Sequence, residues 1–364
     1  MATTTFATTS NLALKVWAKK AFNDAVKATL YGKLTGSSER AIVQVKDDLK
    51  KSKGDKITFG LRSLPTGIGV QEDETLEGNE EGLDFKDFSL LLGEKRHAIK
   101  VDLNLSQQRT MFDVRAEAKS ALGEWLEEYL DTTFFEYLTG YGKGSSSTVS
   151  KYHPNGALGG NSLQTPSSDR IIYGGTTATS KATIAVGDVM TLSVLDKVAE
   201  ALKLASPTIR KGSFDGKNAW VVILHPYQVN DLRSQTSTGQ WFDIQKAAMM
   251  GGKVSDNPIW SESLGMYRDM ILVESTRVPT ATDYGAGANI SAARALVLGA
   301  QAAVVAHGQD TDEMGKMSLV ERTFDYGKRY GVGVTLIWGL AKTRFSSQSD
   351  FAVYAIDTAA KAHV

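Results

Sequence analysis

The histidines and carboxylates are the residues from which catalytic or metal chemistry would be built in this chain. The five histidines are scattered, and none has a partner at the spacing typical of metal ligands. His225 follows the apolar run VVIL and precedes Pro226, which predicts a strand end, where α/β enzymes place functional groups. With Asp231 nearby, it could serve a metal-free α/β enzyme as a base. The structural alternative is a hydrogen-bonded histidine beside the helix that follows.

No catalytic or nucleotide-binding motif is complete in the sequence. HExxH, GxSxG and the phosphate loop GxxxxGK followed by Ser or Thr are absent, and the nearest imitation, residues 212–218, is one residue short. Gly67 and Gly69 lack the third glycine of a dinucleotide-binding loop. The chain has no cysteine, which excludes disulfides and thiolate metal sites. We therefore predict no catalytic residue, no cofactor and no metal site.

Residues 66–85 form the most informative segment, because acidic side chains gather there between two strand-like flanks. The segment has no Lys or Arg, and its carboxylates are Glu72, Asp73, Glu74, Glu77, Glu80, Glu81 and Asp84. They lack the twelve-residue spacing and central glycine of a calcium-binding EF-hand. A connection of about twenty residues without its own core is usually functional or disordered. We predict an extended loop that another subunit holds.

Charges near the base of this loop have the opposite sign. Lys50, Lys51 and Lys53 lie just before the first flanking strand, with further cations at Arg40, Lys46, Lys56 and Arg62. The acidic tip formed by Glu72, Asp73, Glu74, Glu77, Glu80 and Glu81 is therefore expected to contact the basic base of a neighbouring subunit. The alternative is that both groups are merely solvated. Trp17, in the N-terminal segment, is expected to dock on another surface.

Length and composition fit one or two globular domains, since the chain has 364 residues of which 42% are hydrophobic. Lys plus Arg and Asp plus Glu number 41 each, so there is no basic surplus of the kind that grips nucleic acid. No window approaches 18 consecutive apolar residues, and the N-terminus lacks the pattern of a signal peptide. We expect a protein that does not enter a membrane.

The elements that must position these residues alternate between strands and helices. Apolar residues at three- and four-residue spacings predict a long helix over 106–138, roughly 50 Å in length. A Gly, Ser and Thr-rich stretch, 141–186, indicates a surface excursion or small inserted hairpin. Residues 207–320 alternate apolar strands with helical stretches, and 326–360 returns as two β-rich segments to the long helix. The middle block is then an insertion in a discontinuous domain.

This order of parts resembles the major capsid protein of tailed double-stranded DNA phages, with the Hong Kong ninety-seven type of fold, and specifically the family named for the coat protein of coliphage N-four. The resemblance covers nearly the whole chain, and the loop motif is its most specific part. It is carried by GDKITFGLRSLPTGIGV (54–70), DETLEGNEEGLDF (73–85), RHAIK (96–100), SQQR (106–109), ILHPYQVNDLR (223–233), NPIW (257–260), LGMY (264–267), YGVGVTLIWGLAKTRF (330–345) and FAVYAIDTAA (351–360).

The resemblance implies an α+β fold with an N-terminal arm, an extended β-hairpin loop, a long spine helix in a peripheral domain and an inserted α/β axial domain. The expected bounds are 1–53 for the arm, 54–103 for the loop, 104–205 with 326–364 for the peripheral domain, and 206–325 for the axial domain, with 141–186 as the candidate insertion.

By the same resemblance, the protein is expected to assemble with itself into pentamers and hexamers that tile an icosahedral shell, without covalent cross-links. The shell would enclose double-stranded DNA without sequence-specific binding, be built in the host cytoplasm, and meet scaffolding, decoration and portal proteins. Two alternatives stay open: an encapsulin-like nanocompartment shell with the same fold, and the metal-free α/β enzyme with a site near His225 and Asp231.

Overall fold

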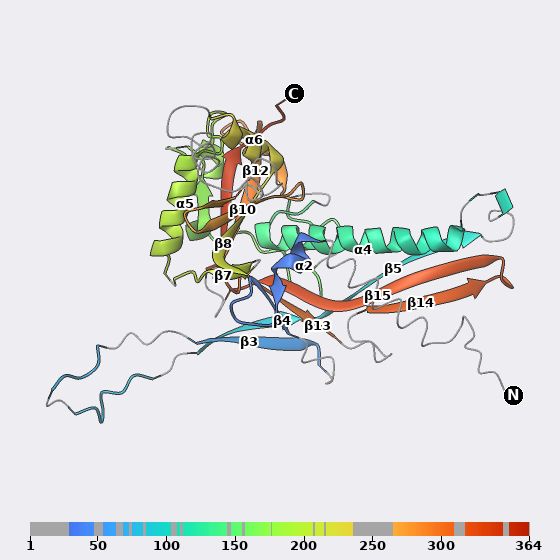
Figure 1. The fold of residues 1–364 in the computed structure, drawn as a ribbon, viewed down its shortest axis with the longest axis horizontal. Coiled ribbons are helices and arrows are strands. Elements are labelled where there is room, and N and C mark those ends of the chain that lie inside the picture. Colours follow the sequence, from blue (N-terminus) through green and yellow to red (C-terminus); the bar gives the residue numbers. More distant parts are fainter. Residues whose placement is uncertain are drawn as a thin grey trace, which may run out of the picture.

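The computed structural model describes most of the chain and places it in an elongated body with a projecting hairpin (Figure 1). The described residues are 29–46, 54–62, 68–72, 75–82, 85–102, 108–109, 111, 113–143, 147–154, 157–175, 177–206, 208–214, 216–235, 265–308, 317–344 and 349–363. Trp17, Lys50, Lys51, Lys53, Asp73 and Glu74 lie outside them.

A six-stranded sheet and a long helix form one part of the body. The sheet runs in the order β1-β2-β13-β15-β14, with β5 also paired to β15. Its strands are β1 Thr35–Gly36, β2 Val43–Lys46, β5 Gly93–Asp102, β13 Ala303–His307, β14 Met317–Phe324 and β15 Arg329–Lys342. The short helix α2, Leu30–Leu34, and the long helix α4, Val114–Thr139, accompany them. Figure 1 shows α4 lying along β5 and β15.

The sequence pattern of β15 explains how this sheet and α4 meet. Alternate residues of the strand, from Tyr330 through Val332, Val334 and Leu336 to Trp338, are buried, as period-two side-chain alternation requires for one covered face. The indole of Trp338 donates a hydrogen bond to the Tyr129 hydroxyl of α4, 2.9 Å away. The strand and the helix therefore share one core.

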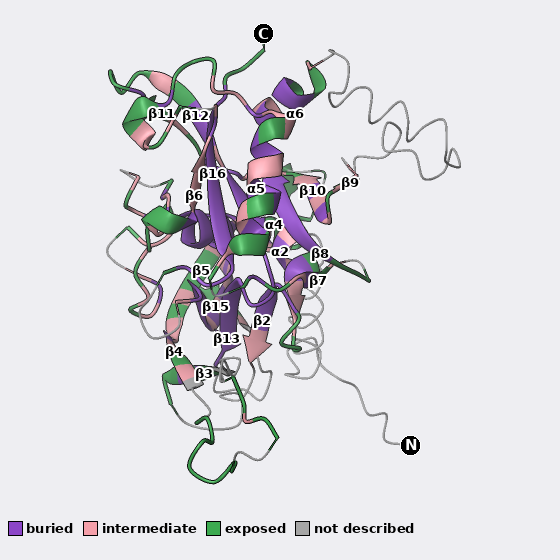
Figure 2. Ribbon diagram, turned by 90° about the vertical axis from the view of Figure 1, so that its left-hand side faces the viewer, coloured by how far each residue is buried: buried purple, intermediate pink, exposed green. Residues whose placement is uncertain are grey.

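An eight-stranded sheet forms the second part of the body. Its order is β6-β16-β12-β8-β10-β9, with β11 paired to β12 and β7 to β8. Its strands are β6 Ile171–Tyr173, β7 Gly212–Phe214, β8 Lys217–Leu224, β9 Met266–Tyr267, β10 Met270–Glu274, β11 Thr280–Tyr284, β12 Ile290–Leu298 and β16 Val353–Ala359. Helices α5, Leu192–Leu204, and α6, Pro226–Arg233, lie over it, and Figure 2 shows β8, β12 and β16 buried beneath them.

Two short 3₁₀ turns, η2 Ser168–Arg170 and η3 Lys181–Thr183, complete the second part.

A third, two-stranded sheet pairs β3, Lys56–Arg62, with β4, Phe85–Leu91, in antiparallel register. This hairpin points away from both larger sheets in Figure 1. The described residues between its strands, 68–72 and 75–82, lie farther from the body than the strands do (Figure 1).

The long helix begins later than the sequence pattern predicted. It starts at Val114 rather than 106, and its 26 residues span about 39 Å at 1.5 Å per residue. Asp113 supplies the start signal, because its carboxylate accepts a hydrogen bond from the Arg115 amide at 2.9 Å. Gly140 ends the helix in the left-handed conformation at φ 62°.

Sheet membership also differs from the expected division at residue 326. β13 and β14 were assigned to the middle block but pair with β15, while β16 was expected at the long helix but pairs with β12 and β6. A boundary at 326 would cut the tight turn between β14 and β15, where Lys328 donates its amide proton to the Asp325 carbonyl. The chain returns to the first sheet before that turn and leaves it after β15.

The described part of 141–186 is not an inserted hairpin. β6 within it pairs in parallel with β16, and Leu158 and Arg170 are buried. The buried carboxylate of Glu136 on α4 accepts hydrogen bonds from the Lys143 and Lys151 amides at 2.7 and 2.8 Å. Some of its glycines permit close packing, since a methyl group on Gly142 would overlap the backbone of Val149 and one on Gly174 the backbone of Asp188.

Candidate functional site

The end of the β3–β4 hairpin is the candidate interaction site of the molecule. Of the described residues in 68–72 and 75–82, all are exposed except Val70, which is half-buried. Ile68 is 98% exposed and Leu76 60% exposed, although both are large aliphatic residues. Isolated apolar residues on a surface are common, but two on one projecting loop mark a surface available to a partner.

The tip has a local structure of its own. The Asn79 amide donates to the Leu76 carbonyl at 3.0 Å, and its side-chain amide donates to the Thr75 carbonyl at 2.9 Å. The Glu80 carboxylate accepts from the Gly78 amide at 2.7 Å. These contacts shape a turn from within residues 75–80, so the tip does not need the body of the subunit to form it.

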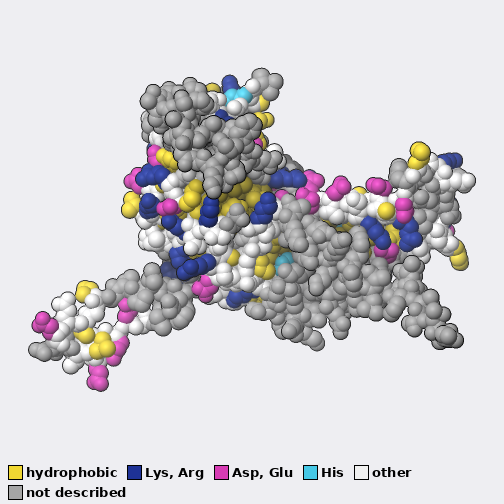
Figure 3. Space-filling view, viewed as in Figure 1, with side chains coloured by type: hydrophobic (Ala, Val, Ile, Leu, Met, Phe, Trp, Pro, Cys, Tyr) yellow, Lys and Arg dark blue, Asp and Glu magenta, His cyan; other side chains and the backbone are white. Residues whose placement is uncertain are grey.

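The described acidic residues of the predicted contact lie together on this tip. Glu72, Glu77, Glu80 and Glu81 are all exposed, and Glu72 has a left-handed backbone at φ 46°. Figure 3 shows acidic and apolar side chains side by side at the end of the loop. The tip can thus offer a partner carboxylates and aliphatic side chains at once.

The described part of the loop base carries both signs of charge. Arg40 and Lys56 are exposed, and so are Glu39 and Asp55. Lys46 is half-buried, donates a hydrogen bond to the Thr58 carbonyl at 3.2 Å and lies 4.7 Å from the centre of the Phe59 ring. Lys46 is therefore tied to β3, whereas Arg40 and Lys56 remain accessible to a neighbour.

His225 acts as a helix cap. Its Nδ1 accepts a hydrogen bond from the Tyr227 amide at 3.2 Å at the start of α6, and its own amide donates to the Gln228 side chain at 3.0 Å. Burial lowers the pKa of the imidazole, which favours the neutral form that accepts this bond. This is the structural alternative expected from the sequence.

Asp231 faces a different partner. Its carboxylate lies 2.9 Å from Nε2 of His363 near the C-terminus, and burial raises the pKa of the carboxyl group. Among the residues that the structure describes, no group of three or more His, Asp or Glu side chains is arranged to hold a metal ion. The described helices include none long and apolar enough to cross a membrane.

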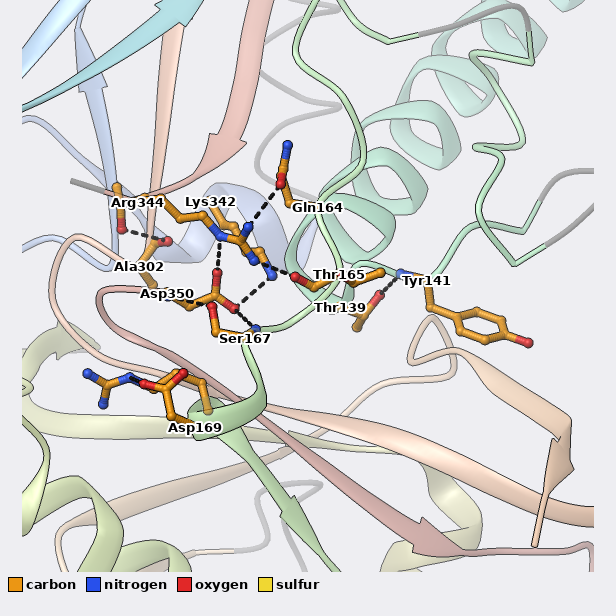
Figure 4. A network of polar contacts seen from close by, with 12 residues as sticks. Thr139, Tyr141, Gln164, Thr165, Ser167, Asp169, Ala302, Lys342, Arg344 and Asp350 are labelled. Atoms are coloured by element: carbon orange, nitrogen blue, oxygen red, sulfur yellow. Dashed lines mark hydrogen bonds and ion pairs between the residues drawn. The ribbon is translucent and has the colours of Figure 1, made fainter. Parts of the chain in front are cut away.

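A buried ionic cluster, which sequence patterns did not indicate, joins the two large sheets (Figure 4). Asp350, just before β16, lies 2.8 Å from Lys342 at the end of β15 and 2.6 Å from Arg344. Its carboxylate also accepts the Ser167 amide at 3.1 Å, and Arg344 donates to the Thr165 carbonyl. The cluster fixes the segment that passes from one sheet to the other.

The whole chain matches known capsid proteins. A family described as phage capsid protein matches residues 5–362. The chain belongs to this phage capsid protein family. The major capsid protein of Pseudomonas phage KPP25 is 25% identical over 94% of this chain and 93% of its own length.

Solved structures agree with this assignment. The capsid of Ralstonia phage GP4 is 32% identical, covers 100% of both chains and has a TM-score of 0.80. The capsid of cyanophage Pam1 is 23% identical over 99% of both chains, with a TM-score of 0.72. The Hong Kong ninety-seven type of fold is thereby confirmed for this capsid protein. Family membership implies a structural role, self-association into a shell and a place in the virion.

Proposed function

We propose that this chain is the major capsid protein of a tailed phage, assembling with itself into pentamers and hexamers that tile an icosahedral shell. The observation that carries the proposal is the match of this chain, over its full length, to phage capsid proteins. Its hairpin, which projects its tip into solvent, agrees with that role. A compact monomer would gain nothing from exposing Ile68 and Leu76, whereas a tiled shell gives each tip a neighbour.

The contact we propose at each tip combines charge with apolar burial. Glu72, Asp73, Glu74, Glu77, Glu80 and Glu81 of one subunit would face the loop base of the next, where Lys50, Lys51 and Lys53 join Arg40 and Lys56. The exposure of the described members of both groups supports this pairing. Exposed ion pairs contribute only about 0 to 1 kcal/mol each, but a shell repeats them in every subunit.

Each of the two large sheets corresponds to one proposed domain of the capsid protein. We propose that α4 and the six-stranded sheet form the peripheral domain, and that the eight-stranded sheet, including β16, forms the axial domain around capsomer centres. Residues 1–53 would be the arm, with Trp17 docking on a neighbour, and 54–103 the extended loop. The net charge of zero limits repulsion between many packed copies.

The enclosed cargo would be double-stranded DNA, held without sequence-specific contacts, in shells built in the host cytoplasm with scaffolding, decoration and portal proteins. The balance of 41 basic and 41 acidic residues supports enclosure rather than binding, because gripping phosphates requires a basic surplus. An encapsulin-like shell would enclose a protein cargo instead. Nuclease-protected DNA in particles recovered from infected cells would distinguish the two.

Sedimentation velocity tests the proposal directly. The purified protein, alone and together with the other head proteins of its phage, should sediment as capsomers and as larger closed particles. A single compact monomer under every condition, including with those partners, would contradict shell assembly. A small oligomer with a measurable turnover that His225→Ala abolishes would instead favour the enzyme alternative.

A further inference from the structure

The corner at which β4 turns into β5 sets the direction of the projecting hairpin. The chain leaves the hairpin at Leu91 and enters the six-stranded sheet at Gly93, so a single residue separates the two sheets. A small cluster packs one side of this corner: Ile57, Phe59 and Leu90 of the hairpin against Val304, Ala306 and Ala341 of β13 and β15. Apolar packing of this kind is not directional, and a second contact must fix the angle.

Asn161 supplies directional contacts at the corner. Its side-chain oxygen accepts the Leu91 amide at 3.1 Å, and its side-chain nitrogen donates to the Leu91 carbonyl at 2.7 Å. The same nitrogen donates to the Leu158 carbonyl at 2.8 Å, within a tight turn closed by the Asn161 amide. One amide side chain thus satisfies both backbone groups of the last hairpin residue.

Tyr137 connects this turn to the long helix. Its hydroxyl donates to the Asn161 carbonyl at 3.0 Å and accepts the Leu158 amide at 2.8 Å. Burial raises the pKa of Tyr137 to about 12, so the hydroxyl keeps its proton near neutral pH and can both donate and accept. A continuous hydrogen-bonded path therefore runs from α4 through the turn to the end of β4.

Two glycines allow the turn to approach the corner closely. A methyl group on Gly93 would overlap the backbone of Gly159, and one on Gly159 would overlap the backbone of Leu92 and Gly93. Gly159 also has φ 62°, a conformation that residues with a side chain rarely adopt. Gly60, in β3 of the same hairpin, would have nothing within 4 Å of an added methyl group. Close approach is thus a property of the corner and not of every glycine in the hairpin.

We propose that residues 157–162 clamp the hairpin at a fixed angle to α4, with Asn161 and Tyr137 as positioning residues. The clamp gives a role to residues 157–162 of the Gly, Ser and Thr-rich stretch. This part of the inference rests on the proposed function: in a shell, the fixed angle of the hairpin would also determine which neighbouring subunit the tip reaches. Loosening the clamp should leave each subunit folded and broaden the range of directions that its hairpin adopts.

The absence of cysteine makes a distance measurement on the isolated subunit straightforward. Spin labels on Asp87→Cys in β4 and Glu124→Cys in α4, both exposed, would report the hairpin angle by pulsed electron resonance. The test variant is Asn161→Ala. Its matched control is Asn79→Ala, which removes a side-chain hydrogen bond within the tip, to the Thr75 carbonyl.

The clamp predicts a broader or shifted distance distribution for Asn161→Ala, and a wild-type distribution for Asn79→Ala. Hydrogen exchange at the Leu91 amide should rise by roughly two- to tenfold, the range expected for the net contribution of one hydrogen bond. A folded Asn161→Ala subunit with unchanged distances would overturn the proposal. If that variant does not fold, Tyr137→Phe decides by the same criterion, because it removes only the hydroxyl.

Gly93→Ala, compared with Gly60→Ala, tests the close approach independently. The first should alter the distance distribution and give shells of irregular size, and the second should do neither. Unaltered distances in the Gly93 variant would count against the clamp. The distances are measured on the isolated subunit, so they test the clamp even if the wild-type protein forms no shell. Normal shells together with unchanged distances would reject the clamp and leave the proposed function standing.

Discussion

Replacing Asp350 with Ala should destabilise the subunit far more than removing an exposed carboxylate does. Asp350 and Lys342 are both fully buried, at 0% side-chain exposure, and lie 2.8 Å apart between the two large sheets. The substitution leaves the Lys342 ammonium without its carboxylate and also removes one of the acceptors of Arg344 and the acceptor of the Ser167 amide.

The expected loss follows from the burial of the charge. Breaking a buried ion pair by removing one partner typically costs about 3–5 kcal/mol, because the remaining charge is uncompensated. The matched control is Asp283→Ala, which breaks an ion pair of similar length, 2.7 Å to Lys181, with side chains 47% and 39% exposed. An exposed pair contributes about 0–1 kcal/mol, so the two variants should differ by several kcal/mol.

The pH dependence of the Asp350→Ala variant gives a second signature. Burial lowers the pKa of Lys342 to about 8 in the intact protein while Asp350 opposes that shift, so the variant should lower the pKa further. The unfolded chain then binds more protons than the folded one, up to the ordinary lysine pKa of about 10.4. The stability of the variant therefore rises with pH across this window. Because the intact protein gains equally once pH exceeds its own Lys342 pKa of about 8, the deficit should shrink as pH rises toward about 8 and stay level above it.

Urea unfolding of unassembled subunits at several pH values would measure both effects, with the slope compared between variants to confirm that the same transition is observed. The reasoning fails if Asp350→Ala costs no more than Asp283→Ala. A deficit that grows as pH rises would show that Lys342 is not the group left unpaired.

Three further predictions concern assembly and the spine helix. Replacing residues 72–81 with a short Gly-Ser turn should leave thermal unfolding nearly unchanged but abolish stable shells, since the described tip residues are exposed; normal particles would make the tip dispensable. Reversing Glu77 and Glu80 to Lys should lower the yield of shells. Wild-type shells should also form less readily in about 1 M salt, where the Debye length is about 3 Å. If neither change affects assembly, the contact is made by apolar side chains instead. Trp125→Ala should lower the free energy of unfolding in urea by roughly 1–3 kcal/mol, because the half-buried ring stacks on His97 and Tyr129. The cost is smaller than for a fully buried Trp, and Met111→Ala, at an exposed side chain, should have no effect. Equal values for the two variants would show that the stack contributes nothing.

The elements that the sequence predicted best are those with strong local patterns. The β-rich segment that begins at 326 and the acidic run of 72–81 both correspond to what the structure contains, the strand β15 and a tip whose described residues are exposed. The start of the long helix was missed because apolar spacing was followed upstream past Asp113, whose capping hydrogen bond ends the pattern physically. Local rules give element types more reliably than their ends.

The contacts that matter most for positioning could not be predicted, because they join distant parts of the chain. Asn161 reaches Leu91 across 70 positions, and Asp350 reaches Ser167 across 183. Neither residue carries a local sign of its partner, since an Asn in a Gly-rich stretch is also typical of a surface turn. The placement of the last strand differed from the expectation for the same reason, because β16 follows β15 closely in sequence but pairs in the other sheet.

Negative-stain electron microscopy of the purified protein, with and without the other head proteins of its phage, tests the central conclusion most directly. The account predicts closed, uniformly sized particles whose walls show rings of five and six subunits. Fields that contain only monomers or small oligomers under all of these conditions would contradict it.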